Sequence, residues 1–217
     1  MAQTITVNVD LTPAMLGQVS GPNAKATAWA VYFNAGGVDP VWTPLTAAST
    51  PLSFQTPQIG QKIYFILQST DSAPDEGNSV KAKITTESQI VPTGPATAAD
   101  KLNYRYDSFE VTFTPAAADA GNLTDIEGFG LPMAVEVVYS NGTSATRGYN
   151  ISGGTVDAVG GIWNALKDAG GGDSSIQNFS AIATGGYASS QPRMAISPAT
   201  AIAGNVPGTT YTNRLNR

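Results

Sequence analysis

The sequence predicts a mainly β fold, an antiparallel β-sandwich or barrel with a small helix-containing part at its C-terminal end. Apolar and polar residues alternate in several short runs, Gly- and Pro-rich stretches separate these runs, and one helical pattern occurs late in the chain. Of the 217 residues, 41% are hydrophobic and 12% are charged, a balance typical of a folded chain with a sizeable core.

The predicted strands follow one another closely. In the first, Ile5, Val7, Val9 and Leu11 alternate with polar residues, which is the period of a half-buried strand. Asn141-Gly142 lies between two later strands and is a strong hairpin signal. The remaining strands are predicted at residues 28–33, 62–67, 80–86, 104–113, 131–139 and 146–151. We therefore expect residues 1–151 to form the β-domain.

A single helix is predicted over residues 156–169. Val159, Ile162, Trp163 and Leu166 recur there at helical spacing, and Gly170 follows as a stop signal. Residues 152–217 are expected to form a helix-containing segment that packs on the β-domain or completes it.

Composition excludes several kinds of chemistry. The chain has no histidine and no cysteine, which removes Ser-His-Asp and Cys-His machinery, the usual zinc sites and disulfides. Carboxylates remain as the plausible catalytic groups, and no metal or cofactor is expected. The net charge is -5 and the bases are scattered, so we expect no nucleic-acid partner.

The sequence also bears on localisation. No apolar run approaches the roughly 20 residues of a membrane span, so we expect no membrane insertion. The start of the chain lacks the basic and apolar regions of a signal peptide. The low charge and the many Gly, Thr, Ser and Asn residues are nevertheless typical of a secreted or extracytoplasmic protein.

Two segments carry the carboxylates of interest. On a strand over residues 104–113, Phe109, Val111 and Phe113 share one face, and Glu110 points to the other. Asp125 and Glu127 directly precede a Gly-x-Gly-Leu-Pro turn, and Glu127 lies 17 residues after Glu110. Adjacent antiparallel strands could therefore place Glu110 and Glu127 on opposite walls of one cleft.

The sequences of these two segments are similar to the motifs of a known enzyme family. The first reads Asn103-Tyr-Arg-Tyr-Asp107-Ser-Phe-Glu110-Val-Thr112, and the second reads Asn122-Leu-Thr124-Asp-Ile-Glu127-Gly-Phe129-Gly130-Leu131-Pro132. Together with Gly60-Gln-Lys-Ile-Tyr64-Phe65, they resemble family 64 glycoside hydrolases over about residues 58–150. These are bacterial endo-β-1,3-glucanases with a thaumatin-like β-barrel.

The resemblance implies hydrolysis of β-1,3-glucan with inversion. It implies Glu110 as the general acid and Glu127 as the general base, where the family has Asp; Asp125 is an alternative base. We predict substrate contacts from Asp107, Asp125, Tyr104 and Tyr106. The family has a second, mixed α/β domain, whereas only 67 residues follow Asn150 here.

Other interpretations stay open. The chain could be a non-catalytic glucan- or cell-surface-binding module, or a secreted structural or assembly protein. A glucanase or a binding module could function as a monomer, whereas an assembly protein would form oligomers. We expect a monomer. For single residues, a structural interpretation competes throughout: Glu110 on a solvated face, Asp107 as a hydrogen-bonding residue, and Trp29 and Trp42 in the core in place of sugar platforms.

Overall fold

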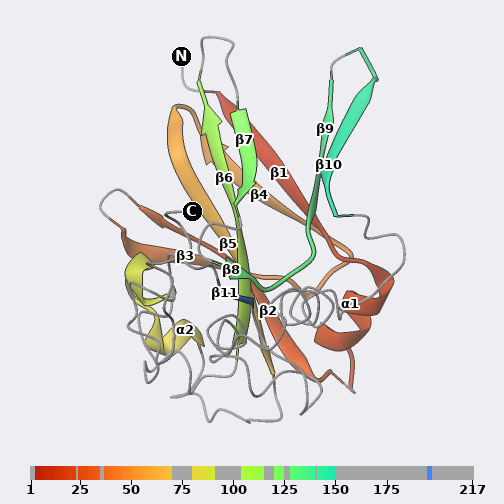
Figure 1. The fold of residues 1–217 in the computed structure, drawn as a ribbon, viewed down its shortest axis with the longest axis vertical. Coiled ribbons are helices and arrows are strands. Elements are labelled where there is room, and N and C mark those ends of the chain that lie inside the picture. Colours follow the sequence, from red (N-terminus) through yellow and green to blue (C-terminus); the bar gives the residue numbers. More distant parts are fainter. Residues whose placement is uncertain are drawn as a thin grey trace, which may run out of the picture.

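The computed structural model describes residues 3–22, 24–34, 37–69, 80–90, 104–114, 120–124, 128–139, 141–149 and 195–196. The fold is mainly β, as predicted, and is built from several antiparallel sheets with a few short helices (Figure 1). The elements are β1 (Thr4–Asp10), α1 (Pro13–Val19), β2 (Ala26–Asn34), β3 (Val38–Pro44), β4 (Ser49–Gln55), β5 (Gln58–Ser69), α2 (Val80–Lys83), the 3-10 turn η2 (Glu87–Gln89), β6 (Tyr104–Phe113), β7 (Ala120–Thr124), β8 (Gly128–Phe129), β9 (Ala134–Val138), β10 (Ser144–Gly148) and β11 (Ala195–Ile196).

The central sheet has five antiparallel strands in the order β3-β2-β5-β6-β7. β5, with 12 residues, lies in the middle and pairs with β2 on one side and β6 on the other. Among the described strands, β3 and β7 are open edges, and no pairing closes the sheet into a barrel. β3 contains Pro40 and Pro44, which an edge strand tolerates because one side of its backbone needs no partner.

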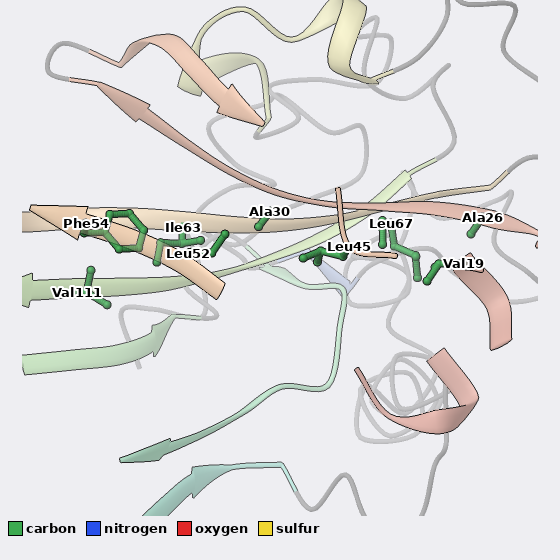
Figure 2. Close-up of a cluster of buried hydrophobic side chains, with 10 residues drawn as sticks. Val19, Ala26, Ala30, Leu45, Leu52, Phe54, Ile63, Leu67 and Val111 are labelled. Atoms are coloured by element: carbon green, nitrogen blue, oxygen red, sulfur yellow. The ribbon is translucent and has the colours of Figure 1, made fainter. Parts of the chain in front are cut away.

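One face of the central sheet packs against the β1–β4 pair. β1 and β4 form their own two-stranded sheet. The protein has two hydrophobic cores, one on each face of the central sheet, and Val7, Val9, Leu52 and Phe54 of this pair belong to the one that we call the second core. Figure 2 shows this core running along the sheet from Phe54 and Val111 at one end to Val19 and Ala26 at the other. The predicted alternation in β1 is confirmed, since Ile5, Val7 and Val9 are partly buried and their neighbours are exposed.

The opposite face of the sheet is covered in part by residues 80–90. Val80, Ile84 and Ile90 are fully buried there against β2, β5 and β6. The members of this first core are Val31, Phe33, Tyr64, Ile66, Val80, Ile84, Ile90, Tyr104 and Tyr106. The central strands are therefore buried on both faces over much of their length.

The prediction of a strand over residues 80–86 is wrong. Val80–Lys83 is a helical turn, and only Thr86 forms an isolated bridge, to Val38. The alternation Val-Lys-Ala-Lys-Ile fits the two-residue period of a strand and also the period of a helix. Val80 and Ile84 are four residues apart and therefore lie on one side of a helix. The tertiary contact decides between the two: both side chains enter the first core while Lys81 and Lys83 stay exposed.

The hairpin predicted at Asn141-Gly142 is confirmed. β9 and β10 pair antiparallel, and Gly142 donates its N–H to the Tyr139 carbonyl across a three-residue loop. Gly142 has φ +82, the left-handed conformation that glycine adopts without steric cost. A three-residue hairpin loop commonly consists of a turn followed by one residue in the left-handed conformation, and Gly142 is that residue here.

The C-terminal part contributes one short element to the description. Ala195 and Ile196 form β11, which pairs with Phe129 and Gly128 of β8. The helix predicted over residues 156–169 and the boundary near residue 151 lie outside the described residues. No helix within the described ranges has the length and apolar character needed to cross a membrane.

Candidate functional site

Glu110 lies near the C-terminal end of β6, on the face of the sheet that carries the first core. In the register of the sheet it pairs with Lys62 of β5 and Asn122 of β7, so all three side chains lie on one face. Glu110 is partly buried, whereas Phe109, Val111 and Phe113 point to the second core. The predicted division of this strand into an apolar face and a Glu110 face is therefore confirmed.

A bulge in β5 places a glycine beside this carboxylate. The register of β5 and β6 shifts between Gln58 and Gln61, and Gly60 in the bulge has φ +61. A Cβ at Gly60 would lie 3.7 Å from Glu110 Oε1, an ordinary van der Waals contact, so Gly60 lies directly beside this carboxylate. The Gly60 N–H donates to Thr112 Oγ1 over 3.1 Å, and this bond fixes the bulge against β6. Ile59, next to it, is 77% exposed.

The next row of the same face holds two buried residues with polar groups, Tyr64 and Ser108. Tyr64, Ser108 and Thr124 pair across β5, β6 and β7. The Tyr64 hydroxyl donates to Glu87 Oε1 over 2.7 Å, which ties η2 to the sheet. Ser108 is buried, and no hydrogen bond to its hydroxyl is found in the part of the chain that the structure describes. Sequence reasoning missed these groups, because their proximity depends on strand register.

Asp107 is a buried anchor on the opposite face of β6. Its Oδ1 accepts from the Ser108 N–H at 2.9 Å, and its Oδ2 accepts from the N–H groups of Gly130 and Leu131, each at 3.3 Å. The side chain is 2% exposed. Its placement gives it a structural role, holding the chain after β8 to β6, and leaves no exposed carboxylate for the predicted substrate contact.

Tyr104 and Tyr106 are core residues. Both are buried, and the Tyr104 hydroxyl donates to the Ile90 carbonyl over 2.7 Å. The Tyr106 ring packs 6.2 Å from the rings of both Tyr64 and Tyr104, centroid to centroid. They share the face of Glu110, but neither ring has a face open to a sugar, so their placement does not support the predicted contact with substrate.

Glu127 and Asp125 lie outside the described residues. The chain on both sides of them is held to β6: Thr124 pairs with Ser108, and Gly130 donates to Asp107. Gly130 packs so closely on β6 that a Cβ there would overlap the Tyr106 carbonyl oxygen. The stretch that carries both acids therefore starts and ends beside residues 106–108, two to four residues from Glu110.

Two tryptophans form a second aromatic group, at the β3 edge. Trp29 and Trp42 are partly buried, with ring centroids 6.0 Å apart in an edge-to-face arrangement. Lys81 Nζ lies 5.3 Å from the centre of the Trp29 ring. Both rings pack against the first core, which favours the structural interpretation over a sugar platform.

Within the described ranges, no three acidic side chains gather as a set of metal ligands. Comparison of the chain with models of known protein families, with curated protein sequences and with solved structures finds no match.

Proposed function

We propose that this chain hydrolyses β-1,3-glucan with inversion, and that Glu110 is the general acid. The observation that carries the proposal is the position of Glu110: a partly buried carboxylate on a strand of the central sheet, between Lys62 and Asn122, with Gly60 beside it. A catalytic group held on a strand keeps its geometry better than one on a loop. The thaumatin-like fold belongs to the same proposal, and the β1–β4 pair stacked on the five-stranded sheet supports it.

The second carboxylate in this proposal is Glu127, with Asp125 as the alternative. An inverting enzyme needs about 6.5–9.5 Å between its two carboxyl groups, because a water molecule must fit between the base and the sugar. Three residues separate Thr124, which pairs with Ser108 of β6, from Gly128, and Gly130 two residues later donates to Asp107 of β6. The described neighbours of this stretch, Thr124 and Gly130, both contact β6 within four residues of Glu110, and this proximity supports the assignment.

The chemical step follows from these roles. The protonated Glu110 gives its proton to the glycosidic oxygen as the bond from that oxygen to the anomeric carbon breaks. The base takes a proton from water, whose oxygen attacks the anomeric carbon from the opposite face of the ring. The side chain of Ile59, which is 77% exposed and lies in the bulge next to the acid, offers an apolar contact for a sugar ring. A polysaccharide substrate fits a secreted or extracytoplasmic location.

The test is release of reducing ends from laminarin by the wild type and by Glu110→Gln. We expect the substitution to lower the rate by at least about 100-fold, because general acid catalysis contributes roughly that much or more. The matched control is Glu136→Gln, the same change at an exposed position of β9, which should leave the rate unchanged.

NMR of the first product formed should show the α-anomer, since inversion at a β-linkage yields it. Equal rates for the wild type and Glu110→Gln, or a β-anomer as first product, would contradict the mechanism. Retention on insoluble β-1,3-glucan without any cleavage would instead favour the non-catalytic binding module.

A further inference from the structure

Asn122 is the side chain next to Glu110 on the outer strand of the central sheet. β7 is the last strand of this sheet among the described residues, and Asn122 pairs directly with Glu110 across β7 and β6. Side chains paired in this way share one face of the sheet and have Cβ atoms about 4.5–5.5 Å apart. Asn122 is exposed and Glu110 is partly buried, so the amide is accessible directly beside the carboxylate.

The position of Asn122 is fixed by the strand that carries it. Its neighbour Gly121 faces the other side of the sheet, where a Cβ would lie 2.7 Å from Phe109 Cζ. The Phe109 ring therefore packs over Gly121 in the place of a side chain, an arrangement that helps to hold paired strands in register. β7 pairs with β6 over all five of its residues. A side chain on a strand held in this way keeps its geometry better than one on a loop.

Neither the Asn122 amide nor the Glu110 carboxylate is used to hold the described structure together. Over the described ranges, no hydrogen bond to either side chain is found, whereas the buried Asp107 and Tyr64 each hold another segment to the sheet. Asparagine is depleted in strands, so Asn122 does little for the stability of β7. Its amide offers two N–H donors and one carbonyl acceptor. The pair is therefore suited to a ligand that carries neighbouring hydroxyl and ether oxygens.

We propose that Asn122 binds the sugar unit that leaves when Glu110 protonates the glycosidic oxygen. This inference rests on the proposed function, because the ligand is the substrate of Glu110. In a β-1,3-glucan, free hydroxyl groups at C2 and C4 flank the C3 oxygen that forms the linkage. With Glu110 at that oxygen, the neighbouring amide donates to one of these hydroxyl groups or accepts from it. The contact orients the sugar beside the acid and takes no part in proton transfer.

The kinetics of laminarin cleavage by Asn122→Ala and Asn122→Thr test this contact. We expect each substitution to raise KM about tenfold and to leave kcat within about threefold, because the contact is made in the bound substrate as well as in the transition state. Threonine favours strands, so Asn122→Thr removes the amide without weakening β7. The matched control is Asn8→Ala, at an exposed asparagine of β1, which should change neither constant.

Circular dichroism of each variant establishes that the fold is intact. An unchanged KM in both Asn122 variants, a loss confined to kcat, or an equal rise of KM in Asn8→Ala would overturn the inference.

Binding to laminarin separates this inference from the proposed hydrolysis. Affinity electrophoresis in laminarin gels, with Glu110→Gln as the background, measures the dissociation constant without cleavage, and adding Asn122→Ala should raise that constant about tenfold. A wild type that cleaves laminarin, with unaltered binding in the Asn122 variants, contradicts the role of Asn122 alone. A wild type that binds without cleavage contradicts the hydrolysis alone, and weaker binding by Asn122→Ala then still supports the contact. A chain that neither binds nor cleaves laminarin would overturn both.

Discussion

Gly130→Ala is expected to lower the free energy of unfolding by about 3 kcal/mol or more, because the backbone of β6 leaves no room for a methyl group. A Cβ at this position would overlap the Tyr106 carbonyl oxygen and lie 3.0 Å from the Tyr106 nitrogen. Tyr106 belongs to a central strand that pairs with β5. Relief of the overlap therefore requires Gly130 to move away, which also weakens its hydrogen bond to Asp107.

Urea-induced unfolding followed by circular dichroism measures this change. Gly17→Ala is the matched control: Gly17 lies within α1, has nothing within 4 Å of the added Cβ, and should gain up to about 1 kcal/mol from helix propensity. An unfolding midpoint for Gly130→Ala equal to that of the wild type would show that the close approach to β6 is wrong.

Asp107→Ala should lower the free energy of unfolding by about 3 kcal/mol, because the substitution removes the carboxylate that accepts hydrogen bonds from three backbone N–H groups. The carboxylate accepts from Ser108, Gly130 and Leu131 in a buried setting, and each donor left without a partner carries a desolvation penalty of about 1–3 kcal/mol. Hydrogen bonds to a charged acceptor are also the stronger kind. The lost hydrogen bonds to Gly130 and Leu131 are the ones that connect β6 to the chain after β8.

The same unfolding measurement tests this prediction, with Asp10→Ala as control. Asp10 is an exposed acid at the end of β1, and its removal should change stability by less than about 0.5 kcal/mol. Asp107→Asn should fall between the two, because its amide keeps one of the two oxygen acceptors. Equal stabilities for Asp107→Ala and Asp10→Ala would contradict the anchoring role.

Strands with strong local signals could be predicted from the sequence, and those with weak signals could not. β6 has the predicted bounds, because Phe109, Val111 and Phe113 alternate with polar residues and point to one core. β3 and β4 went unpredicted because Pro40, Pro44 and Pro51 are residues that strands usually avoid. Their place at a sheet edge or in a two-stranded pair is a tertiary property.

The candidate site was predictable only in part. The alternation in β6 correctly predicts that Glu110 and Phe109 point to different faces of the sheet. The same alternation places Tyr104 and Tyr106 on the face of Glu110. Residues 80–90 cover the first half of that face and bury both tyrosines, while Glu110, farther along, is only partly buried. A cover supplied by a distant segment leaves no trace in the pattern of the strand itself.

The pairing of β1 with β4 has a consequence for how the chain folds during synthesis. Thr4 pairs with Gln55 and Asp10 pairs with Ser49, so β1 waits for a partner that is synthesised some 40 to 50 residues later. Pairings so distant in sequence form slowly because a long loop must close first. Until then the apolar side of β1 stays exposed, and exposed apolar strands of this kind favour association between nascent chains.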